Sequence, residues 1–125
     1  MSLILVVEDE HNLRIALERI LKDAGYEVVQ GESGKEALRL CQKTPFDLVI
    51  TDLAMPDMDG LELIQSLRRS HLDLPILAIS GAFNGEFLRI AKALGAVGTL
   101  DKPFTKGDLL AVMNKSLGKR SNPQS

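Results

Sequence analysis

The sequence has 125 residues, enough for one domain with a buried core, and its 15 Lys and Arg against 17 Asp and Glu give a formal net charge of -2. This balance excludes a general electrostatic basis for binding nucleic acid or an anionic membrane surface. A single cysteine excludes an intrachain disulfide, and the short apolar opening, which runs into acidic residues, is unlike a transmembrane helix or a signal peptide. We expect a cytoplasmic protein.

The first part of the chain alternates between strand and helix patterns. The apolar run Leu3–Val7 predicts a buried strand, and apolar residues at helical spacing predict a helix over residues 13–24. A short β-prone run, Tyr26–Gln30, follows. Ser33–Glu36 has the spacing of a capping box and opens a second helix, which ends before Pro45.

The middle of the chain continues this alternation. Leu48–Thr51 predicts a fully buried parallel strand that ends at Asp52, where a loop rich in Pro, Asp and Gly begins. Apolar residues within Leu61–Leu67 predict a third helix. Ile76–Ile79 predicts a fourth strand, which ends at Ser80.

The last part of the chain predicts one more strand between two helices. Asn84 is expected to cap the fourth helix, and Val97–Leu100 is a weak fifth strand. The fifth helix is expected to start near Thr105 and to stop at Gly118, so we divide the chain into a domain, residues 1–118, and a polar tail or cut linker, residues 119–125. The apolar residues expected to be buried by these two helices are Phe87, Ile90, Ala91, Leu94, Leu109, Leu110, Met113 and Leu117.

Five strand-helix pairs with short connections predict an α/β fold, a doubly wound five-stranded parallel sheet with five helices and the flavodoxin-like strand order 2-1-3-4-5. In this order strands 1 and 3 are neighbours. Their carboxyl ends carry Glu8, Asp9 and Asp52, and the next two strands end near Ser80 and Lys102. Ligands bind at this edge of open α/β sheets.

Three carboxylates at one edge raise one another's pKa unless a cation lies among them. Mg²⁺ prefers oxygen ligands of this kind. We assign Asp9 and Asp52 as direct ligands and the backbone carbonyl of Ala54 as a third, with Glu8 acting directly or through water.

Asp52 would then keep one oxygen facing a cation, a lysine and a hydroxyl, an arrangement suited to nucleophilic attack on phosphorus. We therefore predict Asp52 as a phosphoacceptor, with Lys102 and Ser80 contacting the phosphoryl oxygens. Each residue alone has a plainer interpretation: charge at a helix start, a loop aspartate, a turn serine, a solvated lysine. Their joint placement at consecutive strand ends favours the chemical interpretation.

From Leu3 to about Leu117 the chain resembles the receiver domains of two-component response regulators and is similar to single-domain chemotaxis regulators. The resemblance is carried, in order, by Glu8-Asp9, Asp52–Gly60, Ser80-Gly81 and Lys102-Pro103-Phe104.

The resemblance implies Mg²⁺-dependent transfer of a phosphoryl group to Asp52 from a histidine kinase or a histidine phosphotransfer protein, and a cis Lys102–Pro103 bond. It also implies that the face formed by the fourth helix, fifth strand and fifth helix switches, to control a downstream protein or a missing output domain or to form a homodimer. Thr99 replaces the aromatic residue usual in that switch, and Phe83 is a candidate substitute.

Three other functions are compatible with a fold of this kind. A haloacid-dehalogenase-type aspartyl phosphatase would need Asp-x-Asp after the first strand, where this chain has Glu8–Glu10. A flavin or nucleotide binder would need a phosphate cradle there, and the acidic run repels phosphate. A receiver-like scaffold that is never phosphorylated is disfavoured by the complete set of acid, hydroxyl and lysine.

Overall fold

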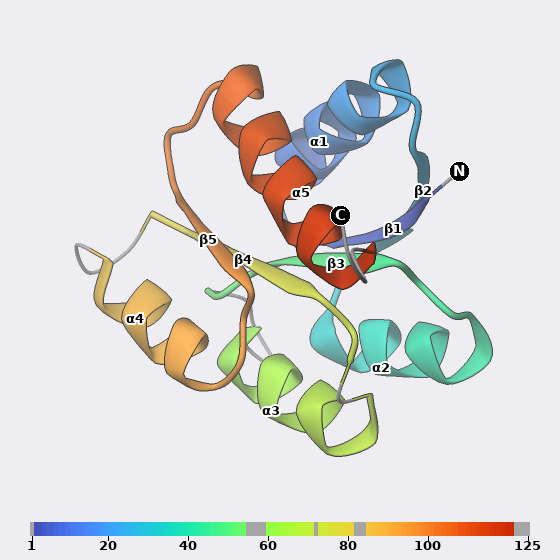
Figure 1. Cartoon of the computed structure of the whole chain (residues 1–125), viewed down its shortest axis with the longest axis vertical. Helices are drawn as coiled ribbons and strands as arrows, with labels where there is room; N and C mark the ends of the chain where they lie inside the picture. The colour runs from blue at the N-terminus through green and yellow to red at the C-terminus, as the bar shows by residue number, and fades with distance from the viewer. Residues whose placement is uncertain (1, 55–59, 72, 82–84, 122–125) are drawn as a thin grey trace.

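The computed structural model describes residues 2–54, 60–71, 73–81 and 85–121. Strands and helices alternate through these residues (Figure 1). In chain order they are β1 (Leu3–Val7), α1 (His11–Asp23), β2 (Glu27–Gly31), α2 (Gly34–Lys43), β3 (Leu48–Asp52), α3 (Gly60–Ser70), β4 (Ile76–Ser80), α4 (Glu86–Ala93), β5 (Gly98–Asp101) and α5 (Lys106–Ser121).

The five strands form one parallel sheet in the order β2-β1-β3-β4-β5, which confirms the predicted topology. Its register brings the functional ends together: Val7 pairs with Thr51, Asp52 with Ile79, and Ser80 with Asp101. The residues at the carboxyl ends of β1, β3, β4 and β5 therefore lie along one edge. The sheet was predictable because parallel strands buried on both faces show continuous apolar runs.

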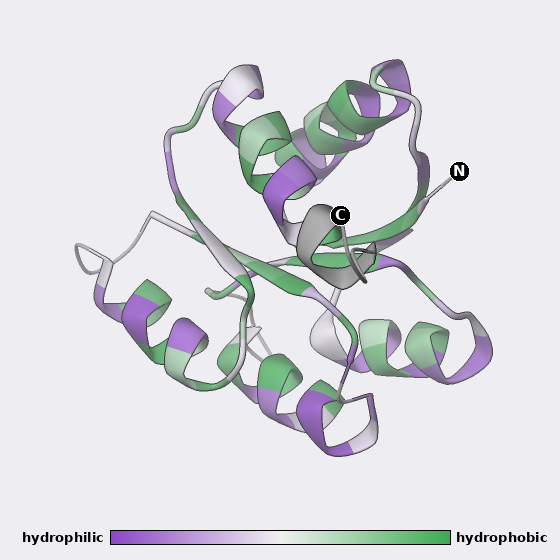
Figure 2. Ribbon diagram, in the orientation of Figure 1, coloured by the Kyte–Doolittle hydropathy of each residue, from purple (hydrophilic) through white to green (hydrophobic). Residues whose placement is uncertain are grey.

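Helices cover both faces of the sheet, α1 and α5 on one side and α2, α3 and α4 on the other (Figure 1). Alternate side chains of each strand feed two separate cores, so that Leu5 and Val49 pack toward one helical layer and Ile4 and Ile50 toward the other. In Figure 2 the middle of the sheet is hydrophobic, whereas each helix has both hydrophobic and hydrophilic residues. The two cores hold the central strands in place and thereby fix the edge where Asp52 lies.

Local capping sets where the helices begin. Ser33 Oγ accepts a hydrogen bond from the Glu36 N–H at 3.2 Å, as predicted, whereas Glu36 Oε1 reaches past Ser33 to the N–H of Glu32 at 2.8 Å. At α5, Thr105 and Asp108 form a reciprocal capping box with bonds of 3.1 and 3.0 Å.

Three details of the last two helices differ from the prediction or lie beyond it. Ile90 is 43% exposed, because the buried positions of the short α4 are Leu88 and Ala91. Helix α5 continues to Ser121, so the expected stop at Gly118 is wrong. The expected cap Asn84 lies outside the described residues.

Candidate functional site

Carboxylates from two neighbouring strand ends converge at the carboxyl edge of the sheet. One carboxylate oxygen each from Glu8, Asp9 and Asp52 lies within 4.8 Å of the others. Glu8 and Asp9 follow β1, and Asp52 ends β3, the strand beside it. The predicted convergence of these three acids is confirmed.

The environments of the three acids differ sharply. Glu8 is 1% exposed and Asp52 is buried, whereas Asp9 faces solvent. The N–H of Glu10 donates to Glu8 Oε2 at 3.2 Å. Glu8 Oε1 is buried and accepts no hydrogen bond from any described residue. A buried carboxylate oxygen without a hydrogen bond, whose ion pair with Lys102 Nζ is long at 3.6 Å, is costly beside two further carboxylates unless a second cation meets it.

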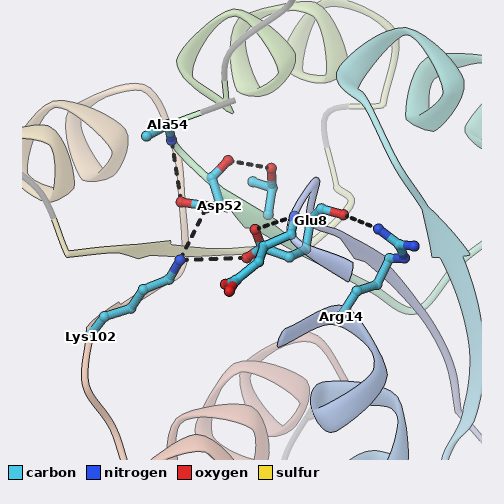
Figure 3. A network of polar contacts seen from close by, with 7 residues as sticks. Glu8, Arg14, Asp52, Ala54 and Lys102 are labelled. Atoms are coloured by element: carbon cyan, nitrogen blue, oxygen red, sulfur yellow. Dashed lines mark hydrogen bonds and ion pairs between the residues drawn. The ribbon is translucent and has the colours of Figure 1, made fainter. Parts of the chain in front are cut away.

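Lys102 reaches this cluster from the residue after β5 (Figure 3). Its Nζ donates to Asp52 Oδ2 at 3.1 Å and lies 3.6 Å from Glu8 Oε1. The other oxygen of Asp52, Oδ1, accepts a hydrogen bond from the N–H of Ala54 at 3.2 Å. Both oxygens of Asp52 are thus held in defined directions.

Burial and charge together shift two ionisation equilibria. Burial, followed by repulsion from Asp52, raises the pKa of Glu8 to about 7. For Lys102, burial disfavours the ammonium, but Asp52 and Glu8 outweigh it, so the pKa of Lys102 is raised. Glu8 is therefore only partly ionised near neutral pH, and a second positive charge beside Lys102 would favour its carboxylate form.

These residues fit a hard divalent cation. The three acids offer oxygen atoms as metal ligands at close range. One of these atoms, Glu8 Oε1, is buried and accepts no hydrogen bond from the described residues. Mg²⁺ would take carboxylate oxygens and keep several waters, for which the exposure of Asp9 leaves access. The assignment of the Ala54 carbonyl as a further ligand stays a prediction.

The remaining predicted residues lie as follows. Ser80 is buried at the end of β4, directly across from Asp101 of β5, and so lies on the same edge as Asp52. The Lys102–Pro103 bond is cis, as the resemblance implied. Thr99 is half-buried on β5, and Phe83 lies outside the described residues.

Gly81 has a structural role that the sequence did not indicate. A Cβ at this position would lie 3.0 Å from the Cβ of Lys102. The missing side chain therefore leaves room for the stem of the lysine that reaches Asp52.

Arg14 is a buried residue near the site that sequence reasoning missed. It is 6% exposed, and its Nη1 donates to the backbone carbonyl of Glu8 at 2.8 Å (Figure 3). A signal was present: positions 14, 17 and 21 share the buried face of α1, so Arg14 occupies a place where an apolar residue is normal.

An apolar hollow of about 550 Å³ adjoins the acid cluster. One wall belongs to α1 and the other to the segment after β5, and Lys102 and Gly81 lie at its edge. Its lining residues are Leu13, Ala16, Leu17, Ile20, Gly81, Lys102, Pro103 and Phe104.

The fold and site define a class of protein. It is a flavodoxin-like α/β protein with three carboxylates that could bind a cation, and a lysine beside them, at the carboxyl edge of its sheet. None of the helices in the described residues has the length and apolar character needed to span a bilayer.

Comparisons with known proteins identify the family. Residues 4–114 match the response regulator receiver domain. The chain is 35% identical to the response regulator receiver protein CpdR of Brucella abortus, with 94% of this chain and 98% of CpdR covered. It is 29% identical to sporulation initiation phosphotransferase F of Bacillus subtilis, with 95% and 96% covered. The chain belongs to the receiver domain family of two-component response regulators.

A solved structure and two longer relatives are also similar to this chain. Chemotaxis protein CheY4 of Vibrio cholerae superposes with a TM-score of 0.87 at 36% identity, covering 93% of this chain and 98% of that one. The chain spans only 13% of the sensor kinase CckA of Brucella abortus and 52% of the response regulator MprA of Mycolicibacterium vanbaalenii. Receiver domains are regulatory phosphoacceptor modules in phosphorylation-dependent signalling; they generally bind Mg²⁺ in an acidic pocket and interact with histidine kinases and phosphotransfer proteins.

Proposed function

We propose that Asp52 accepts a phosphoryl group from a phosphohistidine of a histidine kinase or a histidine phosphotransfer protein. The P–N bond of the donor breaks, an Asp52 oxygen forms the new P–O bond, and the imidazole leaves with the electron pair. The observation that carries the proposal is the pair of contacts from Lys102 and Ala54, which aim both oxygens of the buried Asp52.

The other residues of the site would stabilise charge during transfer. Mg²⁺, held by Glu8, Asp9 and Asp52 with the Ala54 carbonyl, would supply neutralisation of the phosphoryl oxygens. Lys102 would provide a second positive charge, 3.1 Å from Asp52 Oδ2, and Ser80 would provide a hydroxyl donor from the end of β4. Positioning and charge neutralisation are most of what phosphoryl transfer requires of a protein.

The decisive experiment is intact-mass measurement after incubation with acetyl phosphate, with and without Mg²⁺. We expect one phosphoryl mass on the wild type that requires Mg²⁺ and is lost in Asp52→Asn. Asp101→Asn, which changes an exposed aspartate at the end of β5, two strands away from β3 in the sheet, is the matched control and should be phosphorylated normally. Phosphorylation of Asp52→Asn would refute the site.

The apolar hollow indicates how a donor would approach. A donor protein must bring an imidazole to Asp52, and the hollow of α1 and the Pro103–Phe104 segment ends at Lys102 and Gly81 beside it. We propose that an apolar helix of the donor seats here, against Leu13, Ala16 and Ile20 of α1. Ala16→Glu should slow transfer from the donor protein and leave phosphorylation by acetyl phosphate unchanged.

For output, we propose the face of α4, β5 and α5, which would control a downstream protein or an output domain or form a homodimer. Ser80 pairs with Asp101 in the sheet, so movement at Ser80 would reach β5 directly, and Ile90 offers an exposed apolar side chain on α4. Sedimentation analysis with and without phosphorylation tests dimerisation, with Ile90→Arg as the variant.

We propose a cytoplasmic location, with which the free thiol of the one cysteine is consistent. The boundary between domain and tail at residue 118 stays a prediction. Neither a haloacid-dehalogenase-type phosphatase nor an unphosphorylated scaffold is favoured by an observation at the site. Turnover of a phosphate ester would support the first.

A further inference from the structure

The guanidinium of Arg14 is buried, and no acidic side chain of the described residues pairs with it. Among the described residues it forms no salt bridge, although it is 6% exposed. Its bonds run to neutral groups: Nη1 to the Glu8 carbonyl at 2.8 Å, Nε to Gln30 Oε1 at 2.9 Å, and Nη2 to His11 Nδ1 at 3.0 Å. A buried charge held only by neutral acceptors costs stability, so its position calls for a functional explanation.

The Glu8 carbonyl belongs to the peptide group that joins Glu8 to Asp9. Its orientation sets the ψ angle of Glu8 and the φ angle of Asp9, and thus the relative directions of the two side chains. On the other side of the residue, the Glu8 N–H donates to the Gly31 carbonyl of β2 at 3.1 Å. Arg14 and Gly31 together hold both polar backbone groups of Glu8.

Arg14 is itself held from β2. Gln30 accepts from Arg14 Nε, and its own Nε2 donates to Glu18 Oε1 at 2.7 Å. Glu18 also pairs with Lys22 at 3.2 Å. Figure 3 shows two cations on different sides of Glu8, Lys102 at the carboxylate and Arg14 at the backbone carbonyl.

We propose that Arg14, oriented by Gln30, is a positioning residue for the cation site: it fixes the Glu8–Asp9 peptide group so that both acids meet Asp52. The inference adds a residue to the Mg²⁺ site of the proposed function and rests on that site. Outer partners of this kind typically change metal affinity by roughly 10- to 100-fold when they are removed.

Arg14 could affect the cation site through its charge alone or by positioning the peptide group. The two explanations predict opposite changes in Mg²⁺ affinity when Arg14 is replaced by Met. If Arg14 acted only through its charge, it would repel Mg²⁺, and Arg14→Met would bind Mg²⁺ more tightly. If it positions the peptide group, Arg14→Met and Arg14→Lys both weaken binding, because neither side chain reproduces the three-way fork of a guanidinium.

The experiment is a titration with Mg²⁺ alone, without a phosphodonor, followed by backbone amide shifts in two-dimensional NMR. We expect roughly 10-fold weaker affinity in Arg14→Lys and Arg14→Met and a smaller loss in Gln30→Leu. The Arg14→Met/Gln30→Leu double variant should match Arg14→Met alone, since Gln30 acts through Arg14. Arg19→Met, at an exposed position of α1, is the matched control and should bind as the wild type does.

Affinities of Arg14→Lys and Gln30→Leu within about twofold of the wild type, or tighter binding in Arg14→Met, would overturn the proposal. The two milder variants decide it if Arg14→Met fails to fold. A wild type that binds no Mg²⁺ would also overturn it. Weakened Mg²⁺ binding in a protein that takes no phosphoryl group would leave this inference standing while the proposed function falls.

Discussion

Lys102 Nζ lies 3.1 Å from Asp52 Oδ2, although fifty residues separate the two along the chain. The same Nζ is 3.6 Å from Glu8 Oε1. The lysine therefore occupies part of the space in which a divalent cation would meet these carboxylates, and it would face phosphoryl oxygens once Asp52 is modified.

Replacing Lys102 with Met separates these two roles. We expect phosphoryl uptake from acetyl phosphate to fall roughly 100-fold, because a preorganised positive charge is lost. We expect Mg²⁺ affinity to rise, because a competing cation leaves Glu8 and Asp52. Rates from intact mass and affinities from titration test both, with Lys106→Met, an exposed lysine at the start of α5, as control. Unchanged uptake would remove Lys102 from the mechanism.

The raised pKa of Glu8 predicts an unusual pH dependence in Mg²⁺-free buffer. Glu8 titrates near 7 in the folded protein and near 4.5 when unfolded, so the folded state holds the proton more tightly. The contribution of this proton to the free energy of unfolding is fully present below pH 4.5 and is lost as the pH rises through 7. The total loss is up to about 3 kcal/mol.

Urea denaturation of the wild type and Glu8→Gln across this range measures the effect. The difference in unfolding free energy between the two should change with pH, whereas Glu27→Gln, an exposed glutamate on β2, should follow the wild type. Parallel curves for the wild type and Glu8→Gln would contradict the expected ionisation.

Gly60 allows the first turn of α3 to pack directly on the end of β3. A Cβ there would overlap the carbonyl oxygen of Asp52 and lie 2.6 Å from Leu53 Cα. We expect Gly60→Ala to lower the unfolding free energy by about 1–3 kcal/mol and to slow phosphoryl uptake, because rigid backbone atoms must move.

Gly107→Ala is the matched control. A Cβ at Gly107 would have only an ordinary contact of 3.7 Å with Thr105 Oγ1, so we expect a gain of up to about 1 kcal/mol from the better helix former. Equal effects of the two substitutions would show that the contact between α3 and β3 is not the cause.

Cys41 should be unreactive in the folded protein. Its thiol is buried in the core, and burial raises its pKa to about 11. We expect alkylation by iodoacetamide at pH 8 to be roughly 100-fold slower than in urea, because both the thiolate fraction and access are low. Rapid labelling of the native protein, measured by mass, would contradict this.

The sheet and the convergence of its acids could be predicted because they depend on strand ends, which continuous apolar runs mark clearly. Leu48–Asp52 and Ile76–Ser80 were expected within one residue of their observed bounds. Knowing that parallel strands end at one edge then sufficed to bring Glu8, Asp9 and Asp52 together.

Features set by tertiary contact could not be predicted in the same way. Helical spacing alone placed Ile90 in the core, but the packing of α4 buries Leu88 instead. Gly118 did not end α5, since a single glycine only weakens a helix. The role of Arg14 depends on a carbonyl and an amide from two other segments, which sequence spacing does not reveal.

Helix α1 turns one side to the apolar hollow, through Leu13 and Ile20, and the other, through Arg14, to the peptide that joins the two acids. A donor that tilted α1 on docking would also move Arg14, and with it the peptide group that joins Glu8 to Asp9. Under the two proposals above, recognition of the donor and retention of the ion would both depend on side chains of α1, so selection on one role would constrain the other.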